Sequence, residues 1–244
     1  MPPVSKVHSQ IIRVGTDFRS LTLKWKEQVT MRPRRILQFI FLGFLTAISP
    51  ASALVGQDDA IRGEMTKAER AYLLSELKSS EKALLGSIRG STQPQWTFKS
   101  SPDAWSIQEC TEHLILAEDL IFDEAQKTLT TPPVARLANA TSAGDHQVVE
   151  QMEDRSKKAK APKIIQPTGK FPTPESAAKE FEFRRNKSIT YVKTTHDPLR
   201  IHAGDGPSGS TADVYQFLLE MAAHSARHTA QIRGVKSAPG YPTS

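Results

Sequence analysis

Residues 215–232 read YQFLLEMAAHSARHTAQI, a helix-forming run in which Phe217, Met221, His224 and His228 follow one another at spacings of four, three and four. These spacings place the four side chains on one face of an α-helix. The side chains around the two histidines are small: Ala222, Ala223, Ser225, Ala226 and Ala230. The run therefore predicts a helix over about 211–235 whose buried face carries a histidine pair, with room beside it for an ion or ligand.

A third histidine, His113, lies in WSIQECTEHLILAE at residues 105–118, a second helical pattern. It falls beside the apolar stripe formed by Ile107, Cys110, Leu114, Ala117 and Ile121. Two imidazoles four residues apart, joined by one from a neighbouring helix, make a three-nitrogen site with an open position, which suits a catalytic metal. The alternative is a set of core histidines satisfied by hydrogen bonds, and the spacing alone leaves both interpretations open.

Start and stop signals delimit four long helices. Thr66 with Glu69, and Ser106 with Glu109, form capping boxes that open the first two helices. No convincing alternation typical of strands accompanies them. The chain is therefore predicted to be an all-α four-helix bundle, with helices over about 66–89, 106–129, 173–195 and 211–235.

Residues 130–172 form a long connection between the second and third helices. It begins near Pro132 and Pro133 and contains one short helical pattern, which Asp145 is expected to cap, followed by the basic residues Lys157, Lys158 and Lys160. Connections of this length in a compact domain are usually lids, binding loops or disordered segments. We expect an irregular excursion here.

The stretch MRPRRILQFIFLGFLTAISPASA at residues 31–53 has a basic start, an apolar run over 36–48 and the small residues Ala51-Ser52-Ala53. This pattern is typical of a secretory signal peptide, and the apolar run is short for a membrane helix of roughly 20 residues. We expect cleavage after Ala53 and a secreted or periplasmic domain over 54–244. A membrane anchor is the alternative. Residues 1–30 are either an extended leader or the product of a start codon assigned too far upstream.

The charge is concentrated in the predicted leader. Of 32 basic and 26 acidic residues in the chain, eight and two lie within residues 1–53, which leaves 24 of each in the remainder. A neutral domain lacks the basic surface that nucleic acid requires. The expected partner is a small-molecule substrate, with no nucleic acid and no stable membrane anchoring after leader removal. A homodimer is compatible with the sequence.

Three further features of the sequence bear on function. Cys110 is the single cysteine, so an intramolecular disulfide is excluded; it is expected to pack as a small apolar side chain, with metal binding as a thiolate as the alternative. The stretch GDGPSGST at 204–211 lacks the lysine of a phosphate loop and no strand is predicted before it, so it reads as a turn. His202 beside it is a candidate substrate contact, whereas His146 and His196 are expected at the surface or at helix ends.

Over residues 66–235 the sequence resembles the DinB-like superfamily of four-helix bundles. The resemblance is carried by WSIQECTEHL, by MEDRSKKAKAP with the following PTGKFPTPE, and by YQFLLEMAAHSARHTAQI. The superfamily includes bacterial thiol-dependent S-transferases and mycothiol-dependent isomerases, which hold a divalent metal with one histidine of the second helix and two of the fourth. The resemblance implies that His113, His224 and His228 are metal ligands. The predicted export separates this chain from cytoplasmic thiol cofactors, so the implied reaction is left open.

These features together predict a metal-dependent transferase or hydrolase, with zinc as the first choice of metal and nickel, iron or manganese as alternatives. Three neutral imidazoles leave the ion its full charge, so that a bound water or thiol loses its proton near neutral pH and attacks a small electrophilic molecule. Glu112 is a candidate for orienting an imidazole or carrying a proton, as are Glu109 and Glu220, and Arg227 for binding an anionic substrate group. The alternative is a bundle that binds a metal or small ligand without catalysis.

Overall fold

The structure is a computed structural model that describes residues 62–156 and 160–243. The predicted signal peptide, its cleavage point after Ala53 and the basic residues Lys157 and Lys158 lie outside these ranges. Within the two ranges, none of the helices is both long enough and apolar enough to cross a membrane.

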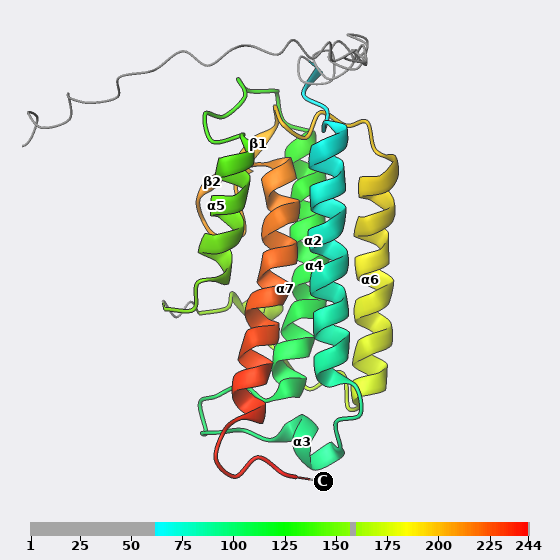
Figure 1. Ribbon diagram of the computed structural model, residues 1–244, viewed down its shortest axis with the longest axis vertical. Coiled ribbons are helices and arrows are strands. Elements are labelled where there is room, and N and C mark those ends of the chain that lie inside the picture. Colours follow the sequence, from blue (N-terminus) through cyan, green and yellow to red (C-terminus); the bar gives the residue numbers. More distant parts are fainter. Residues whose placement is uncertain (1–61, 157–159, 244) are drawn as a thin grey trace, which may run out of the picture. The chain divides into compact units, whose positions relative to one another are not determined.

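Four helices of 21–23 residues form the bundle shown in Figure 1: α2 (Lys67–Ile88), α4 (Ile107–Leu129), α6 (Pro174–Thr194) and α7 (Val214–Lys236). Both α6 and α7 pack against α2 and α4. This confirms the predicted all-α four-helix bundle, and the histidine-bearing helices α4 and α7 are direct neighbours in it.

The predicted capping boxes are formed. The backbone N–H of Glu69 donates to Thr66 Oγ1 at 3.2 Å, and the N–H of Thr66 donates to Glu69 Oε2 at 2.7 Å. Ser106 and Glu109 make the same reciprocal pair at the start of α4. Each pair satisfies two backbone donors that the first turn of a helix otherwise leaves unpaired. The start of α4, and with it the position of His113, is thereby fixed by local sequence.

The expectation that the chain has no strands is wrong at one place. β1 (Ala203–Asp205) and β2 (Thr211–Asp213) form an antiparallel hairpin around the turn at 206–210. Strands of three residues are too short to produce a recognisable alternation. As a result α7 begins at Val214 instead of near Thr211, with Asp213 as its N-cap.

The connection between α4 and α6 returns the chain along the bundle. In Figure 1, α2 and α7 run downward, whereas α4 and α6 both run upward. The segment contains α5 (Ser142–Glu153), which packs against α7, and the single 3₁₀ turn η1 (Lys163–Ile165). The N-cap of α5 is Thr141, whose hydroxyl accepts from the N–H of Gly144, and not Asp145 as predicted. A further short helix, α3 (Gln93–Thr97), precedes α4.

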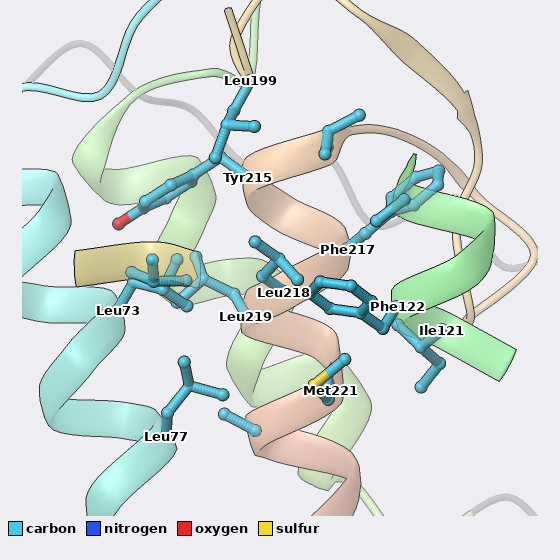
Figure 2. Packing of buried hydrophobic residues seen from close by; sticks show 14 of the residues in the cluster. Leu73, Leu77, Ile121, Phe122, Leu199, Tyr215, Phe217, Leu218, Leu219 and Met221 are labelled. Carbon is cyan, nitrogen blue, oxygen red and sulfur yellow. The ribbon is translucent and has the colours of Figure 1, made fainter. Parts of the chain in front are cut away.

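The apolar core is divided between two clusters of buried side chains. In the first, drawn in Figure 2, Leu218 and Leu219 of α7 lie between Leu73 and Leu77 of α2 on one side and Phe122 of α4 on the other. The second cluster lies where the C-terminal ends of α2 and α7 meet α3, α4 and α6, and it contains Leu84, Trp96, Ile107, Cys110, Leu114, Phe181 and Ile232. Each fully buried aliphatic or aromatic side chain stabilises the fold by about 1.5–3 kcal/mol.

Arg200 ties three helix starts together. Its guanidinium is fully buried and donates to the carboxylates of Glu69, Asp145 and Asp213, which come from α2, α5 and the N-cap of α7. The ring of Tyr215 lies 3.9 Å from its central carbon. Through Arg200, Asp145 therefore connects the start of α5 to the starts of α2 and α7.

Candidate metal centre

The three predicted ligands converge between α4 and α7. His113 lies in the second turn of α4, and His224 and His228 occupy consecutive turns of α7. Their ring centroids are 4.6–5.0 Å apart, and each ring offers a nitrogen within 4.8 Å of the others. His113 Nε2 is 3.2 Å from His224 Nε2. Two nitrogens bound to one tetrahedral zinc lie about 3.3 Å apart, so the spacing of this pair fits a shared ion.

The orientation of His113 is set by a main-chain group. Its Nδ1 lies 2.8 Å from the carbonyl oxygen of Ile165 in η1. A carbonyl oxygen can only accept a hydrogen bond, so Nδ1 carries the hydrogen and Nε2 presents its lone pair toward His224. His228 Nδ1 lies 2.9 Å from Gln231 Oε1, one turn further along α7. In both rings the nitrogen facing away from the cluster is engaged, as is usual for metal-binding histidines.

The electrostatic environment keeps these imidazoles neutral. Burial lowers the pKa of His113 below its usual value. Burial, together with the nearby His113 ring, lowers the pKa of His228 to about 3. Burial and the two other rings lower the pKa of His224 well below its usual range. Neutral imidazoles have the lone pairs that a cation requires, so the site is prepared for metal without first releasing protons.

An aromatic ring covers one side of the cluster. The half-buried Trp105 lies immediately before the N-cap of α4, with its ring centroid 4.9 Å from that of His113 and 6.0 Å from that of His228. Its contact with both rings limits their rotation and gives the site an apolar wall. Nothing in the sequence distinguished Trp105 from an ordinary apolar residue preceding a helix.

A buried ion pair supports α7 behind the histidines. Arg185 of α6 is fully buried and donates two hydrogen bonds to the Glu118 carboxylate of α4. It also donates to Ser225 Oγ at 2.8 Å, on the residue that follows His224. Because Arg185 also donates to the carbonyl oxygen of Leu77 and to Ser80 Oγ of α2, this network joins all four long helices and reduces the freedom of the turn of α7 that carries His224.

The structure brings the three histidines together but gives the predicted acidic partners other contacts. All four hydrogen bonds accepted by the buried Glu112 carboxylate come from residues 168–170. Glu109 serves the capping box and pairs with Lys99 at 3.0 Å. Glu220 accepts from the N–H and hydroxyl of Ser208 in the hairpin turn. Each of these carboxylates therefore binds a loop or connection next to its helix, and these contacts do not include the three histidines.

Arg227, predicted to bind an anionic substrate group, lies beside the ligand pair on α7. Its guanidinium donates to the carbonyl oxygens of Met152 and Asp154 at the end of α5. The positive charge of Arg227 also contributes to the lowered pKa of His224 and His228. Its contacts join the end of α5 to α7 near the site.

The other candidates lie apart from the cluster. Cys110 is a buried free thiol in the second core cluster, as expected, and is not among the residues grouped around the histidines. His146 and His196 are exposed. His202 is buried, and its Nδ1 has no hydrogen-bond partner among the described residues.

Among the groups that orient the histidine rings, Gln231 was detectable from its i,i+3 spacing to His228, whereas the carbonyl of Ile165 carries no sequence signal.

Comparisons with known proteins identify the family of this chain. A model of the DinB superfamily matches residues 76–232. No curated protein matches the chain. Among solved structures, YfiT from Bacillus subtilis, described as a probable metal-dependent hydrolase with an unusual four-helix bundle topology, is similar with 13% identity and a TM-score of 0.49, covering 73% of this chain and 91% of that one. Because the family model spans more than half of the chain and includes all three histidines, the chain belongs to the DinB superfamily.

Proposed function

We propose that this protein is a metal-dependent hydrolase or transferase in which His113, His224 and His228 hold one divalent ion, with zinc as the first candidate. The substrate class that suits the site is a small molecule with an electrophilic centre. The observation that carries the proposal is the approach of His113 Nε2 to within 3.2 Å of His224 Nε2, with Nδ1 of His113 engaged by a carbonyl. A hydrogen bond between two core histidines accounts for that pair alone, whereas one shared ion accounts for all three ring nitrogens lying within 4.8 Å of one another.

The residues around the cluster have distinct tasks in this proposal. The three imidazoles bind the ion and leave part of its coordination sphere open, because they are fewer than the four ligands of a closed structural site. A bound divalent ion supplies Lewis acidity and a nucleophile at neutral pH. Trp105 gives one apolar wall, and Arg227 keeps the end of α5 against α7 at the edge of the site.

Metal binding is tested by titration of the metal-free protein with zinc. An ion that binds only the folded chain at a hundredfold excess over its Kd stabilises it by about 2.7 kcal/mol, which corresponds to a rise in Tm of about 5–10 °C for a chain of this size. The variants His113→Ala, His224→Ala and His228→Ala should each lose most of this rise. The exposed His146→Ala and His196→Ala serve as matched controls and should keep it. Full stoichiometry and an undiminished Tm rise in His113→Ala would exclude the three-histidine site.

Catalysis is tested separately from binding. The zinc-loaded protein, screened against ester, amide and thiol-acceptor substrates, should turn over at least one class, and both a chelator and His228→Ala should abolish that turnover. Zinc binding without turnover in any class would favour the non-catalytic alternative, a bundle that holds a metal or small ligand.

We also propose that the domain is exported. The support is the basic start, the apolar run over 36–48 and the small residues that end at Ala53. N-terminal sequencing of the protein recovered from the producing cell should give a start at Leu54. Soluble cytoplasmic protein that retains residues 31–53 would contradict export and leave the metal-site proposal unaffected.

A further inference from the structure

Two adjacent residues of α4 contact the same loop. Glu112 and His113 both contact the segment that begins at Ile165, the last residue of η1, and leads toward α6. His113 Nδ1 donates to the carbonyl of Ile165 at 2.8 Å, while the Glu112 carboxylate receives donors from residues 168–170. The loop segment 165–170 is therefore bound at both of its ends by one turn of α4.

The Glu112 contact is unusually complete. Oε1 accepts from the N–H and the hydroxyl of Thr168 at 2.8 and 2.9 Å, and Oε2 accepts from the N–H groups of Gly169 and Lys170 at 2.8 and 3.0 Å. Three consecutive backbone donors converge on one buried carboxylate. Gly169 adopts φ +84°, in the left-handed region that favours glycine. The loop conformation thus depends on Glu112, whose carboxylate accepts the hydrogen bonds of the loop N–H groups, and on Gly169, which adopts the backbone conformation of the turn.

We infer that Glu112 is a positioning residue of the metal site: by clamping residues 168–170 it places the carbonyl of Ile165, which holds His113 in the Nδ1–H tautomer with Nε2 turned toward His224 and His228. Its consequence for metal rests on the proposed function, whereas its effect on the tautomer does not. Glu112 does this through the loop and without itself contacting the imidazole.

The chemistry of the clamp predicts the effect of Glu112→Gln. An amide replaces one carboxylate oxygen with an NH₂ group, which on either side would face at least one backbone N–H, a group that can only donate. The loop should loosen, and the Ile165 carbonyl should cease to select one nitrogen of His113. Loss of such an outer contact to a ligand histidine typically lowers metal affinity about 10–100-fold.

The deciding experiment is ¹H–¹⁵N NMR of the histidine side chains in the metal-free full chain at neutral pH, followed by zinc titration. The parent should show His113 as the Nδ1–H tautomer. Glu112→Gln should show a mixture of His113 tautomers, and its zinc affinity should be lower by about tenfold or more. Because the tautomer is read without metal, a parent that fails to bind zinc would contradict the proposed function while leaving this inference decidable.

Two further variants separate positioning from a general loss of stability. Gly169→Ala strains the same turn from the loop side, where a Cβ meets no other atom, and it should shift the tautomer in the same direction even if Glu112→Gln does not fold. Glu220→Gln removes a buried carboxylate that holds a different loop through Ser208, and it should lower stability yet leave the His113 tautomer unchanged. A single Nδ1–H tautomer with parental zinc affinity in both Glu112→Gln and Gly169→Ala would overturn the inference, as would a tautomer change in Glu220→Gln equal to theirs.

Discussion

At the scale of single residues, burial keeps the three histidines neutral and makes the stability of the fold sensitive to acid. The pKa of His228 is about 3, and those of His113 and His224 are lowered, mainly because burial disfavours the charged ring. As the pH falls, the unfolded chain takes up protons near the ordinary histidine pKa of about 6.5, whereas the folded chain does not. The stability that these neutral rings contribute is complete above that pH and declines as the pH falls toward the folded pKa values.

The corresponding prediction concerns the metal-free protein. His228→Gln removes one such group, so between pH 6 and pH 4 its free energy of unfolding should fall less steeply than that of the parent, by up to about 1.4 kcal/mol per pH unit. Urea unfolding at several pH values measures this, with pH 8 as the common baseline. Parallel curves for parent and variant would show that His228 does not stay neutral in the folded protein.

The sequence predicted the clustering of the three histidines better than it predicted their surroundings. The histidine spacings follow from helix periodicity, which is local, so His224 and His228 could be assigned to one face. Glu112 is adjacent to His113 in sequence and is expected from sequence to orient an imidazole, but neighbouring residues of a helix point in different directions, and its carboxylate contacts the loop instead. Contacts with main-chain carbonyls, such as that of Ile165, leave no trace in residue identity.

At the scale of elements, the buried Arg200 fixes the positions of the N-terminal ends of α2, α5 and α7 relative to one another. Arginine presents five donors in a planar fork, which allows one side chain to serve Glu69, Asp145 and Asp213 together. Burial raises the pKa of Asp213 to about 6, and the nearby Arg200 opposes that rise. The guanidinium therefore keeps a closely buried acidic group in its charged form.

Arg200→Lys tests this junction. A lysine ammonium cannot span three carboxylates, and buried charges left without a partner typically cost about 3–5 kcal/mol. Urea unfolding should show a loss of this size, and hydrogen exchange should show faster opening of α5. The exposed Arg89→Lys at the C-cap of α2 is the matched control and should stay within about 0.5 kcal/mol of the parent. If the free energy of unfolding fell by a similarly small amount in both variants, the junction would not be held by Arg200.

The elements themselves were largely predictable because their signals are local. Capping boxes and apolar periodicity located the four long helices to within a few residues. The hairpin of β1 and β2 and the short helix α3 were missed, since elements of three to five residues show too little periodicity. The cap of α5 was misassigned because Thr141 and Asp145 are both suitable capping residues, and only the position of Arg200 shows that the carboxylate serves another contact.

At the scale of the whole molecule, the parallel course of α4 and α6 accounts for the long connection between them. Two neighbouring helices that run in the same direction require a crossover along the length of the bundle. In this protein the crossover carries α5 and then the loop that contacts Glu112 and His113. Its length was visible in the sequence, but its course was not, because helix directions depend on contacts between distant residues.

The crossover also connects fold and site. The histidines come from α4 and α7, which the bundle places side by side, while the group that orients His113 comes from the returning chain. A bundle with a short loop between its second and third helices would lack this contact. The arrangement of the whole chain therefore determines which nitrogen of His113 faces the cluster.

The central claim, one divalent ion held by His113, His224 and His228, is tested most directly by X-ray absorption at the zinc edge of the zinc-loaded protein. The account predicts three imidazole nitrogens at about 2.0–2.1 Å with one further light ligand and no sulfur, and two imidazoles in His113→Ala. A sulfur ligand near 2.3 Å, or three imidazoles retained in His113→Ala, would contradict it.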